Sequence, residues 1–253
     1  MILVPNLPAP SRLIWRDSVD STNDEARRQV LAGTAADLLV VAAGTQSAGR
    51  GRRGRTWVSP EGNLHCSVVL SVSGRLGQAA QLGFAAAVAV VDALSVLMPA
   101  VRFRAKWPND IVAETPDGWK KCAGMLLEPV GQQWLVLGLG IDVEQAPPPE
   151  GLTHPAISLA QLGYGGRSMA VLEAVMAALV PYVSEWRQNG FAVIRQAWLD
   201  RARGLGEPVI VRLEKDTLTG TFTGLDEEGA LLLDQKGSGL RRILAGDVYF
   251  PPV

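Results

Sequence analysis

Apolar residues gather in two ways along the first 200 positions, as short continuous runs and as longer stretches with a helical period. The runs at 38–43, 64–70 and 134–143 are rich in Val and Leu and predict strands. The stretch 76–98 is rich in Ala, Val and Leu, has Pro99 beyond its end, and predicts a helix packed across a sheet. The other predicted elements are strands at 13–15 and 101–106, a hairpin of 111–114 with 121–128, and helices at 22–33, 169–188 (kinked or broken at Pro181) and 191–201.

The pattern changes after Gly204. Short apolar or alternating runs at 209–213, 217–225, 230–233 and 242–244 are separated by turn signals rich in Gly, Asp, Glu and Lys. Such spacing predicts a small barrel of about 45 residues, a size at which a domain is marginal unless it docks on a larger one. We therefore expect two domains, residues 1–204 and 205–253.

Composition narrows the function classes. The 253 residues are 47% hydrophobic and 19% charged with a formal net charge of −1, which is typical of a compact globular protein and unlike a dedicated nucleic-acid binder. Cys66 and Cys122 are too few for a disulfide framework or a zinc site. The N-terminus lacks the features of a signal peptide, and the longest apolar run, around 84–91, is far short of a membrane span. We expect a cytoplasmic protein that does not bind a membrane.

The stretch 44–57 carries the most unusual chemistry in the chain, because arginines alternate with glycines in it. Glycine lets a backbone approach a ligand closely, and arginine supplies a permanent charge with donors that suit phosphate or carboxylate. The stretch predicts a positive loop that is disordered when empty and closes over an anion. Its arginines are Arg50, Arg52, Arg53 and Arg55, and its interspersed glycines are Gly49, Gly51 and Gly54.

Three other interpretations of this loop compete. Its letters match the dinucleotide-binding pattern G-x-G-x-x-G, but that pattern needs a helix directly afterwards, and residues 56–60 contain Trp57, Val58 and Pro60, a poor helix start. Arg/Gly runs also bind nucleic-acid backbones without sequence preference, and an ordinary charge cluster is a solvated surface loop. Other segments of the chain favour the anion-binding interpretation.

Four segments place polar groups at the ends of predicted strands. Residues 21–23 follow the first strand, where Thr22 and Glu25 predict a capping box that starts a helix. Residues 106–110 put an amide and a carboxylate at a strand end, 120–124 put lysines at the next strand start, and 138–142 add glycines and a carboxylate. Each of these features alone is more typical of capping or of a salt bridge than of catalysis.

In this order the segments resemble the biotin protein ligase family, from Ser18 to Asp142 and again in the C-terminal barrel. The resemblance implies an α+β fold: a mixed β-sheet with packed helices, like the core of class II aminoacyl-tRNA synthetases, plus a small SH3-like β-barrel. It implies ATP-dependent formation of biotinyl-5′-AMP, with Mg²⁺ as the metal, and transfer of biotin to a lysine of a biotin carboxyl carrier domain of a carboxylase. About ten residues precede the first strand, so the resemblance is to the monofunctional branch without an N-terminal DNA-binding domain, and no DNA binding is expected.

The resemblance also implies roles for individual residues. Joining a carboxylate to an α-phosphate brings two anions together, so the site must neutralise charge. Lys121 and Arg50 are the implied catalytic residues, and Asp110 and Asp142 the implied metal ligands. The implied biotin contacts are Ser21, Thr22, Asn23, Gln46, Arg50, Gly51, Arg52 and Lys121, and the implied adenylate contacts are Gly49, Arg53, Arg55, Trp57 and Asn109.

The chain departs from the family at Asp142, where asparagine is usual. Its carboxylate could bind metal, or pair with Lys106 or Lys121. Trp107 is expected in the core. The alternative functions are a lipoate or octanoate ligase of related fold, which would need a longer apolar tunnel, and a nucleic-acid-binding module. An exposed sheet edge in the main domain could also form a homodimer.

Overall fold

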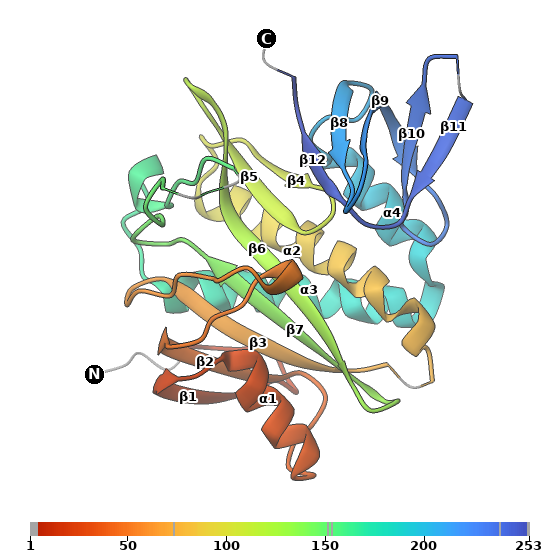
Figure 1. Cartoon of the computed structure of the whole chain (residues 1–253). Coiled ribbons are helices and arrows are strands. Elements are labelled where there is room, and N and C mark those ends of the chain that lie inside the picture. The colour runs from red at the N-terminus through yellow and green to blue at the C-terminus, as the bar shows by residue number, and fades with distance from the viewer. Residues whose placement is uncertain (1–4, 73, 151, 153, 238, 252–253) are drawn as a thin grey trace.

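The computed structural model describes residues 5–72, 74–150, 152, 154–237 and 239–251. Its centre is a seven-stranded mixed sheet in the order β1-β2-β3-β7-β6-β5-β4, in which β1 and β2 are parallel and the other neighbours antiparallel (Figure 1). The strands are β1 Arg12–Val19, β2 Leu39–Gln46, β3 Leu64–Ser71, β4 Phe103–Lys106, β5 Asp110–Thr115, β6 Gly118–Val130 and β7 Trp134–Ile141.

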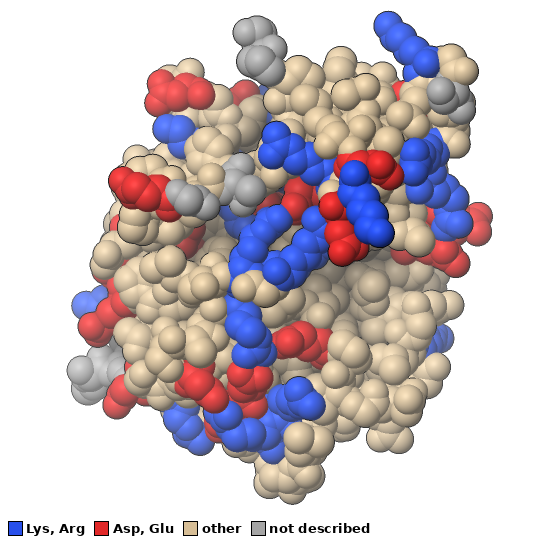
Figure 2. Space-filling model, in the orientation of Figure 1, with Lys and Arg blue, Asp and Glu red and all other residues tan. Residues whose placement is uncertain are grey.

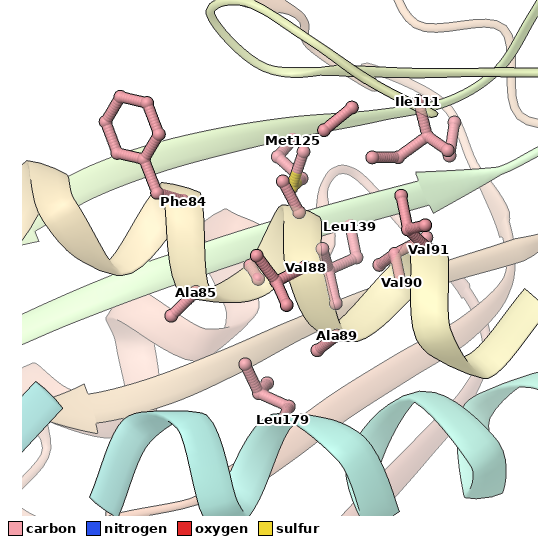
Figure 3. Close-up of a cluster of buried hydrophobic side chains, with 14 of the residues drawn as sticks. Phe84, Ala85, Val88, Ala89, Val90, Val91, Ile111, Met125, Leu139 and Leu179 are labelled. Carbon is pink, nitrogen blue, oxygen red and sulfur yellow. The ribbon is translucent and has the colours of Figure 1, made fainter. Parts of the chain in front are cut away.

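Helices cover the sheet, with α1 Thr22–Leu31 and η1 Arg52–Gly54 on the side toward the viewer in Figure 1. Behind the sheet, α2 Leu82–Leu97 is preceded by the 3₁₀ turn η2 Leu76–Gln81 and lies between the sheet and α3 Ser168–Asn189. Figure 3 shows why α2 is apolar all round: Val88 lies near Met125 and Leu139 of the sheet, and Ala85 and Ala89 lie toward α3. The ring of Phe84 packs instead on those of Phe191 and Trp198, with ring centres 5.3 and 5.5 Å away. The helix expected at 76–98 is present, but its first six residues, Leu76–Gln81, form a 3₁₀ helix.

Two helical stretches are long and apolar enough to cross a membrane by length and composition, Leu76–Leu97 and Ser168–Asn189. Both are longer than the apolar run around 84–91 from which no membrane span was expected. In the first, 72% of the most apolar window is buried inside the protein, which accounts for its composition by core packing. The second packs along α2 through Leu172, Val175 and Leu179.

Two local expectations fail. Helix α3 is not broken at Pro181, because the packing of its buried face on α2 outweighs the hydrogen bond that proline removes; the alternative of a kink there stays a prediction. Helix α1 begins at Thr22 as expected, but its N-cap is Ser21 and no side chain caps it. Glu25 instead pairs with Arg28 at 2.8 Å, so the capping box is absent.

The C-terminal strands form a separate five-stranded antiparallel sheet in the order β11-β10-β9-β8-β12. It docks on the main body through two contacts. The ring centre of Phe222 lies 6.3 Å from that of Trp198 on α4 (Phe191–Asp200), and Trp107 Nε1 donates to the carbonyl of Gly229 at 3.3 Å. Trp107 is 3% exposed, confirming it as core. The strands are β8 Pro208–Arg212, β9 Thr217–Leu225, β10 Leu231–Gln235, β11 Gly239–Ile243 and β12 Asp247–Tyr249; β12 was not predicted. The remaining short helix is η3 Ala160–Leu162.

Candidate active site

A cavity of about 440 Å³ opens between α1, the loop after β2, and the faces of β6 and β7. It brings together nearly all the residues singled out in the sequence, although they come from five separate segments. Those that line it are Ser21, Thr22, Asn23, Gln46, Arg50, Gly51, Arg52, Arg55, Trp57, Asn109, Asp110, Lys121 and Asp142. Gly49 and Arg53 are not among its lining residues.

One wall of the cavity is a network of neutral polar groups. Thr22 donates from its backbone N–H and its hydroxyl to Gln46 Oε1, at 2.7 and 3.1 Å. Ser67 Oγ lies 2.8 Å from Thr22 Oγ1 and 2.6 Å from Asn23 Oδ1. Ser67 is fully buried on β3 and was not predicted from the sequence. It lies inside a strand that is buried along most of its length, and its partners in the network are 44 residues or more away. The interlocking bonds hold the wall in one arrangement.

Glycines on β6 and β7 make room for the side chains that form this wall. A Cβ on Gly138 would overlap the amide of Asn23, and a Cβ on Gly140 would overlap the indole of Trp57. A Cβ on Gly124 would lie 3.1 Å from both Lys121 Nζ and the Trp57 ring. The glycines thus allow close approach, as their pattern in the sequence indicates.

The arginine loop folds into a short hairpin over the cavity, in front of β6 and β7 in Figure 1. Gly51 N donates to the carbonyl of Arg55 at 2.7 Å, and Trp57 N donates to the carbonyl of Gly49 at 2.9 Å. A Cβ on Gly49 would lie 2.5 Å from the Trp57 carbonyl oxygen, so this position requires glycine. These bonds give the hairpin a defined shape, and its disorder in the empty protein stays a prediction.

Acidic partners explain why the arginines can be packed so tightly. Arg50 forms a bidentate pair with Asp24 and also lies 3.2 Å from Glu128 Oε2. These carboxylates raise the pKa of Arg50 further above its ordinary value. Figure 2 shows Lys and Arg side chains gathered across the middle of this face with acidic side chains against them.

On the other side of the hairpin, Arg55 pairs with Asp247 of β12, and Arg53 lies 3.4 Å from the same carboxylate. Arg52 turns inward, donating to Asn109 Oδ1 at 3.1 Å, and burial lowers its pKa. The arginines therefore have four different partners, and the C-terminal sheet supplies one of them, Asp247.

Lys121 reaches the cavity because β6 carries a bulge. The register with β5 shifts so that Cys122 is the extra residue, which re-aims the neighbouring side chains. Lys121 Nζ lies 2.5 Å from Asp110 Oδ1 and 5.4 Å from the centre of the Trp57 ring. The ammonium is thus held by a carboxylate beneath it and an aromatic face beside it.

Asp110 carries two ammonium partners. It faces Lys106 across the β4–β5 hairpin, with Lys106 Nζ 3.7 Å from Asp110 Oδ2, while Lys121 takes Oδ1. Burial alone would raise the pKa of Asp110, but the positive charges of Lys121 and Lys106 outweigh burial and lower this pKa. A carboxylate so engaged has little capacity left for a metal ion.

Asp142 is different, because no described cation lies within salt-bridge distance of it. It is 2% exposed, and its Oδ1 accepts only a long bond of 3.4 Å from Asn63 Nδ2. Burial raises its pKa to about 7, although Lys121 acts in the opposite direction. Asp110, and not Asp142, therefore pairs with both lysines.

Replacing Asp142 by asparagine is expected to stabilise the protein at and above neutral pH. Between about pH 4 and 7 the folded state keeps a proton on Asp142 that the unfolded chain has lost, so stability falls as pH rises through this window. A shift from 3.8 to about 7 corresponds to a loss on the order of 4 kcal/mol. Urea unfolding of both proteins from pH 4 to 9 checks this, and a difference between them that does not vary with pH would contradict it.

Among the described residues, no three His, Cys, Asp or Glu side chains are grouped so as to hold a metal ion. Mg²⁺ is commonly held by one or two carboxylates together with substrate phosphates, so it would enter with a nucleotide as part of the substrate.

The matches to known proteins cover both parts of the chain. Residues 15–142 match the Biotin/lipoate A/B protein ligase family, and residues 204–250 match the Biotin protein ligase C terminal domain. A biotin–[acetyl-CoA-carboxylase] ligase of Paracoccus denitrificans is 39% identical over 91% of this chain and 97% of its own length. The bifunctional ligase/repressor BirA of Escherichia coli is 30% identical over 87% of this chain and 68% of its own length.

A solved structure agrees with the sequence matches. The biotin protein ligase of Aquifex aeolicus, in complex with biotin and ATP, superposes with a TM-score of 0.80 and 29% identity, covering 94% of this chain and 97% of that one. The α+β fold predicted from the resemblance is thereby confirmed. With matching models over both parts and relatives aligned over most of their length, this chain belongs to the biotin/lipoate A/B protein ligase family.

Proposed function

We propose that this protein is a biotin protein ligase, which forms biotinyl-5′-AMP from biotin and ATP and then transfers biotin to a lysine of a biotin carboxyl carrier protein. The observation that carries the proposal is that Lys121, the arginine hairpin and the neutral polar wall all open onto one cavity. The Paracoccus and Aquifex relatives, whose names state this activity and these ligands, support it.

The neutral wall suits the head of biotin, a cyclic urea whose oxygen accepts and whose two N–H groups donate hydrogen bonds. Ser21, Thr22, Asn23 and Gln46 provide such partners without a net charge that would have to be desolvated. Leu139 and Met125 line the cavity nearby and offer apolar contact to the rest of the molecule. The wall binds and orients the acid before any chemistry takes place.

The charged side of the cavity suits the reaction itself. When the biotin carboxylate attacks the α-phosphate, Lys121 lies where it can bind both anions, and Arg52 adds a second cation. Asp110 holds the Lys121 ammonium in place. Mg²⁺ bound with ATP would offset charge on the departing pyrophosphate. The same Lys121 then holds the mixed anhydride while the acceptor amine attacks its carbonyl carbon and AMP leaves.

Trp57 marks where a ligand completes the site. Among the described residues, its Nε1 is one of few buried polar atoms with no hydrogen-bond partner. Its ring rests on Gly140 and beside Lys121. An unpaired buried donor is costly, and a nucleotide or biotin oxygen within reach would satisfy it. Trp57 therefore serves as a ligand contact, in addition to packing on Gly140 and Lys121.

The arginine hairpin acts as a lid over the adenylate and keeps water from the mixed anhydride until an acceptor arrives. Arg50 anchors one side of the lid on Asp24 and Glu128, and Asp247 anchors the other through Arg53 and Arg55. We assign residues 1–204 to the catalytic unit and 205–253 to a C-terminal unit that latches the lid.

Replacing Asp247 by asparagine is expected to speed the release of biotinyl-5′-AMP by about three- to ten-fold. The change removes ion pairs to two partly exposed arginines, each worth about 1 kcal/mol or less. Dissociation of labelled adenylate in a filter-binding chase measures the effect. Asp234→Asn, on an exposed position of the same sheet, is the matched control, and equal release rates for both variants would contradict the latch.

The proposal extends to partners and location. The acceptor is a biotin carboxyl carrier domain, and the proposed site of action is the cytoplasm, without DNA or membrane binding. The open edge of β1 at one end of the sheet is where a second copy could pair. A lipoate or octanoate ligase is the alternative, since the family includes lipoate ligases by name.

A transfer assay decides between these acids. The protein is incubated with ATP, Mg²⁺, an unmodified carrier domain, and biotin, lipoate or octanoate in turn, and the carrier is weighed by mass spectrometry. We expect the mass of one biotin on a single lysine, and calorimetric titration in which biotin displaces lipoate. A carrier labelled by lipoate but not by biotin would overturn the assignment.

A further inference from the structure

A chain of contacts runs from the C-terminal sheet to the ammonium of Lys121. The ring of Tyr249 on β12 lies 4.7 Å from the ring of His154, centre to centre. His154 Nε2 lies 3.0 Å from Lys106 Nζ, and Lys106 Nζ lies 3.7 Å from Asp110 Oδ2. The other oxygen of Asp110 is the one that holds Lys121. His154 lines the cavity, yet neither its sequence context nor the proposed reaction uses it.

The chemistry of the His154–Lys106 contact fixes which atom donates. A lysine ammonium has donors only, so Nε2 of His154 accepts, and the ring proton sits on Nδ1. Burial and the positive charge of Lys106 lower the pKa of His154 to about 4, which keeps the imidazole neutral at neutral pH. The other charged groups facing the ring are Asp110, Lys121 and Asp247.

The backbone ties His154 to Lys121 independently of these side chains. Lys121 N donates to the carbonyl of Pro155 at 2.8 Å, and Ile157 N donates to the carbonyl of Lys121 at 2.8 Å. The segment that carries His154 is thus paired with the bulged part of β6. The distance between His154 and Lys121 is therefore set by strand pairing as well as by packing.

We propose that His154 is a positioning residue: its imidazole holds Lys106 on one oxygen of Asp110, so that the other oxygen is left to aim Lys121 at the reacting groups. Lys106 is 6% exposed and has few alternatives for its three protons. Without an acceptor at His154, Lys106 turns fully onto Asp110 and competes with Lys121 for it. Tyr249 braces the imidazole, so the C-terminal sheet reaches the catalytic lysine through His154. The inference rests on the proposed ligase function.

Two variants test this role. His154→Phe keeps a ring against Tyr249 and removes the acceptor, whereas His154→Gln keeps an acceptor oxygen. We expect His154→Phe to lower kcat for adenylate formation about ten-fold or more, with KM for biotin changed less than two-fold. We expect His154→Gln to stay within three-fold of wild type. Rates are expressed per active site, titrated by the adenylate formed in the first turnover, so that loss of folded protein does not imitate the effect.

The outcomes separate the two levels of inference. No adenylate from the wild type would end the proposed function, whereas an active wild type with an equally active His154→Phe variant would overturn only the role of His154. Equal losses in both variants would also overturn it. Nitrogen NMR of the wild type gives a readout without substrate: the ring should be neutral from pH 5 to 8 with its proton on Nδ1. A proton on Nε2 would contradict the proposal.

Discussion

Replacing Lys121 by methionine is expected to slow the formation of biotinyl-5′-AMP by about a hundred- to a thousand-fold. Methionine keeps the length and apolar stem of the side chain and removes the ammonium that binds carboxylate and α-phosphate. Asp110 keeps Lys106 as a partner, so no unpaired buried charge results. The fold should therefore survive, and single-turnover kinetics with labelled ATP should report the loss of chemistry.

Lys120→Met is the matched control for this experiment. Lys120 is the neighbour of Lys121 on β6, but its only described ion pair is with exposed Asp117, 3.2 Å away. The control should keep adenylate formation within about two-fold of wild type. Equal rates for Lys121→Met and Lys120→Met would mean that the ammonium in the cavity does not take part in the reaction.

Replacing Arg50 by alanine is expected to let biotinyl-5′-AMP escape about ten- to a hundred-fold faster. Arg50 joins the hairpin to Asp24 and Glu128 on two other elements, and without it these carboxylates repel each other beneath the lid. An open lid also exposes the mixed anhydride to water, so biotin and AMP should accumulate in solution when no acceptor is present. Chromatography of the filtrate measures both products.

The control here is Arg27→Ala, on the exposed face of α1 outside the cavity. It changes the net charge by the same amount as Arg50→Ala. If Arg50 holds the lid closed, biotinyl-5′-AMP should leak faster from Arg50→Ala than from Arg27→Ala. Retention by Arg50→Ala equal to that by Arg27→Ala would refute the role.

The parts of the site that could be predicted are those set by local sequence. Lys106 and Asp110 flank a tight turn, so they face each other across a hairpin whatever the rest of the chain does. The apolar runs of β2, β3 and β7 are long enough to give strands near their expected ends. Glycines at 138 and 140 mark close approach because few other features favour glycine within a strand.

What could not be predicted depends on partners far away in the sequence. Glu128 and Asp24 neutralise Arg50, and Asp247 neutralises Arg55, across 26 to 192 residues. The arginine charges alone predict a loop that is disordered when empty, because these partners leave no mark near the arginines in the sequence. The same holds for Ser67, which joins the polar wall from within an otherwise buried strand. The assignment of residues to biotin, nucleotide and metal stays a prediction.

The central claim is that Lys121 and the arginine hairpin act on one activated acid in one cavity. The most direct measurement mixes the protein with biotin, Mg²⁺ and ATP labelled at the α-phosphate, removes free ligand by gel filtration, and identifies by mass spectrometry what the denatured protein releases. We predict one equivalent of biotinyl-5′-AMP per chain. Recovery of unreacted biotin and ATP would contradict the claim. So would a protein that releases no ligand, if the filtrate contains no labelled adenylate either.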